Sequence, residues 1–161
     1  MTRDQDVTTL ARGPAAERVL SGAPTQVLRQ IAALNSAREY SSGSLLFREG
    51  EPAEGIFLLC RGAVKLSVGC SHGDSLVLRS AGPGEILGLS ATLTGQGHEV
   101  TAETTTPSQV VFVKRKDFLR YLREHKEVCL RVVESLSNDL QAAYERVRML
   151  GLARIRHPHN N

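Results

Sequence analysis

Residues 84–102, GEILGLSATLTGQGHEVTA, have the glycines of a loop that could bind a phosphate or another small anion, and we call this segment the glycine loop. Gly84, Gly88, Gly95 and Gly97 allow the backbone to turn with positive φ and to approach a ligand closely. Successive N–H groups that end in a short helical turn form a concave set of donors for an anion. However, the segment contains no lysine or arginine to pair with the charge of such a ligand.

The polar side chains of the glycine loop have structural interpretations beside this functional one. His98 could contact an anion, but a lone histidine is more often a surface or hydrogen-bonded structural residue. Thr92, Thr94 and Thr101 could donate hydroxyl groups to a ligand, although strand threonines need no such role. Both interpretations remain open from the residues alone.

Outside the glycine loop, no pattern predicts catalysis or a metal site. Cys60, Cys70 and Cys129 are widely spaced, with no CxxC pair or cluster for zinc or an iron–sulfur centre. Cys60 and Cys129 have apolar neighbours and are expected in the core. There is no nucleophile elbow, Walker loop or metal triad. The sequence therefore predicts a protein that is not an enzyme.

Two further polar groups are expected to be structural. His72, with Cys70 nearby, could ligate a haem, but the segment CSHGD at residues 70–74 is more typical of a hairpin turn. Glu49 and Glu51 lie in another expected turn.

Composition sets the scale of the molecule. The chain has 161 residues, of which 41% are hydrophobic, and it has no tryptophan, which indicates one domain with a mainly aliphatic core. The net charge of +3 is small and is concentrated near the C-terminus, where Arg146, Arg148, Arg154 and Arg156 lie. These arginines could touch DNA phosphates, but we expect them to complement a helix C-terminus in solvent. No apolar run is long enough to cross a membrane and no signal peptide is present, so a cytoplasmic location without membrane partners is expected.

Glycine-punctuated apolar runs dominate the middle of the chain. Residues 1–23 are expected to form a loose arm, and PTQVLRQIAAL (24–34) a short amphipathic helix. From residue 40 to residue 113, apolar runs of four to six residues alternate with turns at glycines 43, 50, 55, 62, 73 and 84. Such spacing indicates a closed or sandwiched antiparallel sheet, with a shielded interior at one end where a small ligand would bind.

Two helices are expected after residue 114: a short one in KRKDFLRYLREH and a long one over residues 126 to about 150. The long helix carries an apolar seam with a 4, 3, 4, 3 spacing, which is a heptad pattern. Such a seam could lie on the domain's own barrel, but the narrow stripe and the helix length favour a parallel coiled coil between two copies of the chain. The seam consists of Cys129, Val133, Leu136, Leu140, Ala143, Val147 and Leu150.

The segment REYSSGSLLFREGEPAEGIFLLCRGAVKLSV and the order of elements resemble the cyclic-nucleotide-binding regulatory domain of the Crp/Fnr transcription-factor family. The resemblance extends over residues 24–154, and Gly43, Gly50, Gly62, Gly84 and Gly88 match its pattern. It implies a mainly β jelly-roll barrel with flanking helices over residues 24–123, a dimerisation helix over 124–152 and a polar tail over 153–161. It also implies a cyclic nucleotide or another small anionic effector as ligand. The implied pocket residues are Gly84, Gly88, Leu89, Ser90, His98, Glu99, Val100 and Thr101.

Two side chains of the glycine loop depart from the family pattern. Relatives that bind cyclic AMP carry a ribose-binding glutamate directly after the second glycine, where this chain has Leu89. The phosphate-binding arginine corresponds to His98 or to Glu99, depending on the alignment. We therefore expect no tight binding of cyclic AMP. A gain of cyclic AMP binding by a Leu89→Glu, His98→Arg double variant would show that these two positions account for the loss.

The family's winged helix-turn-helix does not follow the long helix in this sequence. DNA binding would therefore require a longer form or a partner that supplies it. The expected function is that of an effector-sensing and dimerisation module of a Crp/Fnr-type regulator, which passes its signal through the dimer helix. The alternative is an interaction protein that binds no ligand and dimerises with an intact family member.

Overall fold

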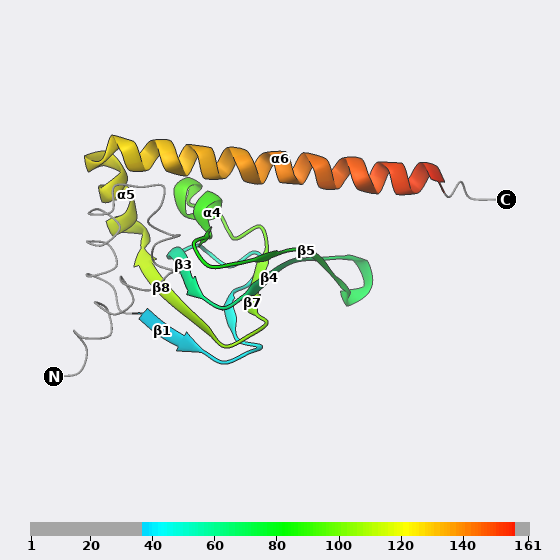
Figure 1. The fold of residues 1–161 in the computed structure, drawn as a ribbon, viewed down its shortest axis with the longest axis horizontal. Helices are drawn as coiled ribbons and strands as arrows, with labels where there is room; N and C mark the ends of the chain where they lie inside the picture. Colours follow the sequence, from blue (N-terminus) through cyan, green and yellow to red (C-terminus); the bar gives the residue numbers. More distant parts are fainter. Residues whose placement is uncertain (1–36, 157–161) are drawn as a thin grey trace.

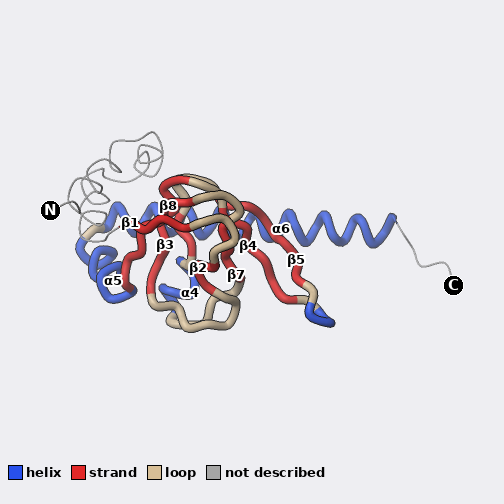
Figure 2. The backbone as a smooth tube through the Cα atoms, turned by 90° about the horizontal axis from the view of Figure 1, so that it is seen from below, coloured by secondary structure: helices blue, strands red, loops and turns tan. Residues whose placement is uncertain are grey.

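The computed structural model describes residues 37–156, so the arm predicted over residues 1–23 and the helix predicted over 24–34 lie outside the described residues. The described part consists of two antiparallel sheets and three α-helices (Figures 1 and 2). The strands are β1 (Ala37–Tyr40), β2 (Leu45–Phe47), β3 (Gly55–Arg61), β4 (Val64–Gly69), β5 (Ser75–Ala81), β6 (Ile86–Leu87), β7 (Thr101–Thr104) and β8 (Ser108–Lys114).

The two sheets are built from strands that are distant in the sequence. The first sheet has the order β1-β8-β3-β6 and the second has the order β2-β7-β4-β5. In the first sheet, Val111 of β8 lies opposite both Ala37 of β1 and Leu58 of β3. This arrangement confirms the predicted jelly-roll fold. Of the closed and sandwiched forms that the spacing left open, the structure has the sandwiched one, because the two sheets remain separate. One edge strand of each sheet is short: β6 has two residues and β2 has three.

The apolar side chains form two cores, one on each face of the first sheet. Alternate residues of β3 point to opposite faces, so Leu58 and Leu59 belong to different cores. The outer core lies between the first sheet and the helices and contains Ile56, Leu58, Cys60, Leu89, Val111, Val113, Phe118, Tyr121, Val128 and Val132. The inner core lies between the sheets and contains Phe47, Leu59, Val64, Leu66, Ala81, Leu87, Ala102 and Val110.

The glycines that punctuate the strands have two different structural roles. Positive φ angles occur at Gly43, Gly50, Gly62, Gly73 and Gly84, which confirms the predicted turns at these positions. Gly55 differs, because it opens β3 and its φ is not positive. A Cβ atom at this position would collide with the carbonyl oxygen of Val113, so Gly55 allows the close approach of two strands and does not form a turn.

The helices are α4 (Leu89–Thr94), α5 (Arg115–Glu124) and α6 (Lys126–Arg156), and a 3₁₀ turn, η1 (Ser71–Gly73), joins β4 to β5. Helix α6 continues to residue 156, beyond the end that the sequence predicts at 150 to 152. The predicted end relies on Gly151, but one glycine costs a helix only about 1 kcal/mol, and helix-forming residues flank it. Residues 153–156, predicted as part of a polar tail, therefore belong to α6, and the remainder of that tail is not described.

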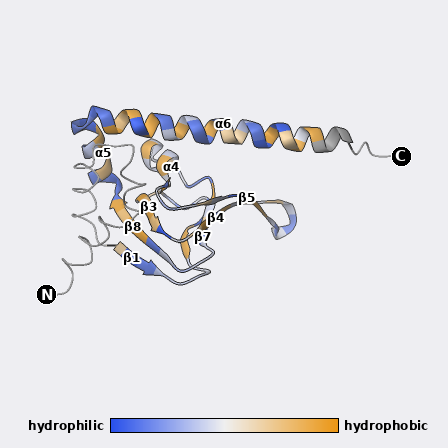
Figure 3. Ribbon diagram, in the orientation of Figure 1, coloured by the Kyte–Doolittle hydropathy of each residue, from blue (hydrophilic) through white to orange (hydrophobic). Residues whose placement is uncertain are grey.

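Helix α6 lies along the side of the sheets and extends past the β4–β5 hairpin (Figures 1 and 2). Its first half packs on the outer core through Val128, Val132 and the half-buried Leu136. Cys129 is half-buried, and its Sγ donates a hydrogen bond to the Leu122 carbonyl oxygen at 2.9 Å. Apolar residues recur along the second half of α6 (Figure 3). The exposed residues of the seam are Val133 in the first half and Leu140, Ala143, Val147 and Leu150 in the second.

Candidate functional site

The backbone of the glycine loop has the turns that the sequence predicts. Gly84, with φ of 95°, follows β5 in a turn, and its N–H donates to the Leu59 carbonyl oxygen at 2.8 Å. Gly88, with φ of 79°, begins helix α4, and Gly95, with φ of 73°, ends it. Only a residue without a Cβ adopts these left-handed conformations without strain. The loop therefore turns at Gly84, Gly88 and Gly95, with helix α4 between the last two.

Leu89 points away from any ligand that this loop could hold. Its side chain is 3% exposed and belongs to the outer core, among residues such as Phe118 and Val132. A glutamate at this position would bury an unpaired carboxylate, which costs several kcal/mol. In this structure, the Leu89→Glu, His98→Arg double variant would therefore measure how well the core tolerates a buried charge, and not only the affinity for cyclic AMP.

His98 is also buried, with 4% of its surface exposed, and it stacks on Phe47 with ring centroids 3.8 Å apart and planes inclined by 15°. Burial lowers the pKa of its imidazole below the ordinary value, and the carboxylates of Glu99 and Glu51 oppose this shift. A neutral imidazole lacks the permanent charge and forked donors of an arginine. His98 is thus poorly suited to bind a phosphate, while Glu99 is exposed and negatively charged.

The other predicted pocket residues are dispersed. Ser90 is exposed on α4, and Val100 is half-buried against the inner core. The Thr101 hydroxyl oxygen accepts a hydrogen bond from the Glu49 N–H at 3.0 Å, which ties β7 to the turn after β2. The structure therefore keeps the backbone of the predicted site together, but it does not gather the predicted side chains around one point.

Arg79 on β5, which the sequence did not single out, contacts both the glycine loop and the long helix. Its Nη1 lies 2.7 Å from Oε1 of Glu85, and its Nη2 lies 3.7 Å from Oδ1 of Asp139 on α6. Glu85 also accepts a hydrogen bond from the Gly82 N–H through Oε2 at 2.5 Å. One side chain thus connects the turn that opens the glycine loop to the middle of α6. A sequence offers no signal for a contact between residues sixty positions apart.

The Arg79 cluster contains one cation and two carboxylates. Burial raises the pKa of the Asp139 carboxyl above its ordinary value, Arg79 lowers it and Glu85 raises it further. Burial is the largest of the three effects, so the ion pair with Arg79 does not offset it, and the second carboxylate adds to the shift. Arg79 consequently holds Asp139 only weakly, and the Glu85 carboxylate lies closer to its guanidinium than the Asp139 carboxylate does.

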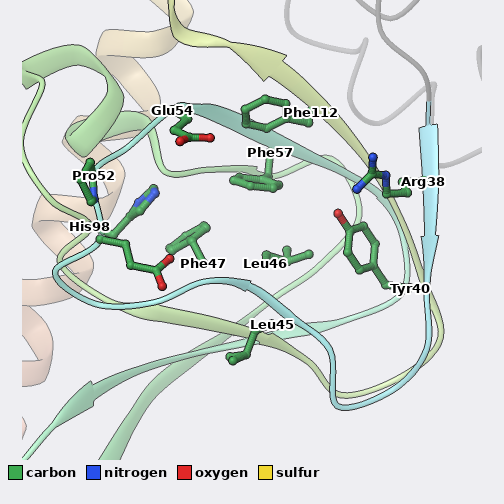
Figure 4. A pocket seen from close by; sticks show the side chains of 11 residues that line it. Arg38, Tyr40, Leu45, Leu46, Phe47, Pro52, Glu54, Phe57, His98 and Phe112 are labelled. Atoms are coloured by element: carbon green, nitrogen blue, oxygen red, sulfur yellow. The ribbon is translucent and has the colours of Figure 1, made fainter.

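A cavity of about 840 Å³ lies at one end of the two sheets (Figure 4), and we call it the aromatic cavity. Its rings come from five parts of the chain: β1, β2, β3, β8 and the end of the glycine loop. The rings form a series in which His98 stacks on Phe47, Phe47 lies 5.4 Å from Phe57, and Phe57 lies 5.0 Å from Phe112. Tyr40, Leu45, Leu46 and Pro52 complete the uncharged lining.

Three charged side chains line the aromatic cavity: Arg38, Glu51 and Glu54. Figure 4 shows Glu54 near the His98 end of the cavity and Arg38 at the other end, beside Tyr40. Of the pocket residues that the sequence predicts, only His98 is in this lining. The sequence predicts a ligand site at one end of the sheets but not these lining residues, because they are apolar or common surface types on separate strands.

The remaining candidates have the structural roles that the sequence favoured. Residues 70–74 form the predicted hairpin turn, with the Cys70 N–H donating to the Asp74 carbonyl oxygen at 2.8 Å. Cys60 is buried in the outer core, as predicted, and burial raises the pKa of its thiol. Within residues 37–156, no group of acidic, histidine or cysteine side chains is arranged to hold a metal ion. No helix in that part of the chain is apolar enough over a sufficient length to cross a membrane.

Comparison with known proteins gives one family and a consistent set of structures. The family model for the cyclic nucleotide-binding domain matches residues 37–125, more than half of the chain. The cAMP-activated global transcriptional regulator CRP of Salmonella typhimurium is 24% identical over 110 residues, which cover 68% of this chain and 52% of CRP. The chain spans about half the length of the curated regulators it matches.

Two solved structures show the same fold. The catabolite activator protein of Thermus thermophilus has a TM-score of 0.73 at 21% identity, covering 83% of this chain and 63% of that protein. The sensor domain of the transcriptional regulator DNR from Pseudomonas aeruginosa has a TM-score of 0.67 at 20% identity, covering 90% of this chain and 95% of that domain. At these identities the likeness concerns the fold.

Proposed function

The chain belongs to the cyclic nucleotide-binding domain family, in the form found in Crp/Fnr-type regulators, and we propose that it is the effector-sensing module of such a regulator, with a degenerate phosphate-binding loop and a signal that passes through α6. The curated relative compared above is a transcription regulator, and we propose no enzymatic activity for this chain. DNA binding would belong to a longer form or to a partner.

The observation that carries this proposal is the contact of Arg79 with both Glu85 and Asp139. Glu85 lies three residues before Gly88, where the glycine loop turns into α4, and Asp139 lies on α6. A ligand that moves the loop must therefore change the distance from Arg79 to one of its two partners. An effector can shift α6 only if it binds one arrangement of Arg79, Glu85 and Asp139 more tightly than another.

Cyclic AMP should bind weakly, because the loop lacks both charged contacts of the family. Leu89 is buried where the ribose-binding glutamate would stand, and neither His98 nor Glu99 can supply a permanent positive charge. Each charge-assisted hydrogen bond contributes about 1.5–3 kcal/mol, so the loss of two weakens binding by about a hundredfold or more.

Isothermal titration of the whole chain with cyclic AMP, cyclic GMP and cyclic di-GMP tests this proposal. We expect no micromolar binding of cyclic AMP by the unmodified chain. The variant Glu99→Arg adds a cation at an exposed position of the loop, and we expect at least about tenfold tighter binding of cyclic AMP. Glu124→Arg makes the same charge change on α5 as a control. Micromolar affinity of the unmodified chain, or an equal gain in both variants, would contradict the proposal.

We also propose that α6 forms a parallel coiled coil with a second copy of the chain. The exposed side chains of Val133, Leu140, Val147 and Leu150 keep the heptad spacing, and a heptad seam is complementary to itself. Light scattering should give the mass of a dimer, whereas a strictly monomeric chain would exclude this arrangement. Co-purification with a full-length family member would instead favour the alternative of an interaction protein that binds no ligand.

The arginines of α6 give little support to DNA binding by this chain alone. Arg146 donates from Nη2 to the Val77 carbonyl oxygen at 3.3 Å, and Arg148 lies 3.6 Å from the Glu145 carboxylate. These contacts engage two of the four C-terminal arginines, and the side chains of the other two, Arg154 and Arg156, lie outside the described part. We therefore assign α6 to dimerisation.

A further inference from the structure

We propose that the aromatic cavity is a second ligand site, which shares only His98 with the glycine loop, and that it binds a planar aromatic amine. The proposal does not depend on the effector-sensing function. It rests on two features of the cavity: its continuous series of rings and the placement of its charges.

The rings give the cavity an apolar wall, in which the planes of Phe47 and Phe57 are inclined by 42° and those of Phe57 and Phe112 by 51°. His98, Phe47, Phe57 and Phe112 follow one another at centroid separations of 3.8, 5.4 and 5.0 Å, and together they extend across the cavity (Figure 4). At about 840 Å³, the cavity has the size that small-molecule sites usually have, roughly 300–1,000 Å³. A flat aromatic ligand could stack on these rings and gain more than its buried area alone supplies.

His98 contributes a ring face to the wall of the cavity, where it stacks on Phe47. Its Nδ1 has no hydrogen-bond partner among the described residues, but it is covered by protein and faces Gly88, where an added Cβ would lie 3.6 Å from it. A ligand in the cavity would therefore contact the ring and not this nitrogen. Burial lowers the pKa of the imidazole, which favours the neutral ring.

The charges select the ligand. Glu51 and Glu54 bring two carboxylates to the cavity, against the single cation of Arg38 at the opposite end. A phosphate or carboxylate near His98 would be repelled, whereas an amino or ammonium group would be attracted both by the carboxylates and by the ring faces. The aromatic cavity is therefore complementary to a cation or an amine, which is the opposite of what a cyclic nucleotide phosphate requires.

Backbone hydrogen bonds hold the His98 end of the cavity in place before any ligand binds. The Gly50 N–H donates to the His98 carbonyl oxygen at 2.8 Å, and the His98 N–H donates to the Glu51 carbonyl oxygen at 2.9 Å. Pro52 and Gly97 form a bridge beside them. These bonds fix His98 and Glu51 relative to each other, so a ligand need not order this end of the site.

Tryptamine, indole-3-ethanol and indole-3-acetate are suitable probes, since they share one ring and differ in charge. The chain has no tryptophan, so indole fluorescence reports the probe alone. We expect saturable binding of tryptamine, weaker binding of indole-3-ethanol and the weakest binding of indole-3-acetate. Cyclic AMP should not displace tryptamine. Absence of saturable tryptamine binding, equal binding of indole-3-acetate, or displacement by cyclic AMP would overturn the proposal.

Variants locate the bound probe. Glu51→Gln combined with Glu54→Gln should weaken tryptamine binding by at least about tenfold and leave indole-3-ethanol binding nearly unchanged, because only the charged contact is lost. Both glutamates are exposed, and a glutamine at 51 keeps an oxygen for the Arg48 N–H. Glu145→Gln on α6 is the matched control and should have no effect. Unchanged tryptamine affinity in the double variant, with the protein folded by circular dichroism, would place the probe elsewhere.

Discussion

The two halves of α6 have opposite environments although they form one continuous helix. Residues 126–139 lie on the outer core and are tied to it through Val128, Val132 and the Arg79–Asp139 pair. From Leu140 to Leu152 every residue is exposed, including apolar side chains that a single domain would normally bury. The difference indicates that the first half stabilises the domain, and the exposed second half is the part for which we propose the coiled coil with a second copy.

Adjacent valines in the first half give the strongest test of this comparison. Val132 is 6% exposed and Val133 is 56% exposed. Val132→Asp would bury an unpaired carboxylate and should lower the free energy of unfolding by about 3–5 kcal/mol, whereas Val133→Asp should change it by no more than about 0.5 kcal/mol. Urea unfolding of both variants at low protein concentration measures the difference. Equal losses of stability would show that the two sides of α6 are not distinct.

The exposed seam should matter for association and not for folding. A Val133→Asp, Leu140→Asp double variant places like charges on the seam in both copies and should weaken self-association by about a hundredfold or more. Sedimentation at a series of concentrations measures this effect. Asn138→Asp adds a charge outside the seam and serves as the control. An unchanged dimer in the double variant would contradict the coiled-coil arrangement.

Arg79 should determine how firmly the middle of α6 is held. Arg79→Ala removes the cation between Glu85 and Asp139 and leaves two carboxylates that repel each other. Amide exchange should become a few-fold faster around residue 139, with little change around Val128 and Val132, which are held by the outer core. Lys65→Ala, which removes the exposed ion pair with Glu103, is the control. Faster exchange along the whole helix would mean that Arg79 supports the fold in general.

The smallest expected effect is the pH dependence that Asp139 contributes. Its pKa is raised in the folded state, so the folded protein binds this proton more tightly than the unfolded chain does. The contribution of Asp139 to stability therefore decreases as the pH rises above 3.8, its ordinary value. Relative to Asp139→Asn, the unmodified protein should lose a few tenths of a kcal/mol over this range, because the side chain is half exposed. Thermal unfolding of both proteins across the pH range measures the difference, and an opposite slope would contradict it.

Features that depend on local backbone chemistry could be predicted from the sequence. Glycines at 43, 50, 62, 73 and 84 mark turns, because positive φ is a property of a single residue. The heptad spacing of α6 includes Val133, Leu140 and Val147, whose side chains are exposed, and their role in a seam stays a prediction. It placed Cys129 and Leu136 on the same seam, although both are partly covered by the outer core. The spacing alone does not indicate at which residue a helix stops packing on its own domain.

The candidate site was harder to predict, because its side chains depend on contacts between distant segments. Alignment with the family places Leu89 and His98 at ligand positions, but the structure buries one in the outer core and stacks the other on Phe47. The apolar nature of Leu89 was itself a signal of burial. Arg79 meets Asp139 only because β5 and α6 lie side by side, which no local pattern indicates.

The length of α6 beyond Asp139 sets the scale of any movement that reaches its C-terminal end. Residues 140–156 form about 25 Å of helix at 1.5 Å per residue, and their described side chains make few contacts with the sheets. A rotation of only about 5° at Asp139 would displace the end of such a rod by about 2 Å. A rotation at Asp139 that is too small to disturb the outer core would thus move the far end of α6 by a distance comparable to the helix shifts that occur at subunit interfaces.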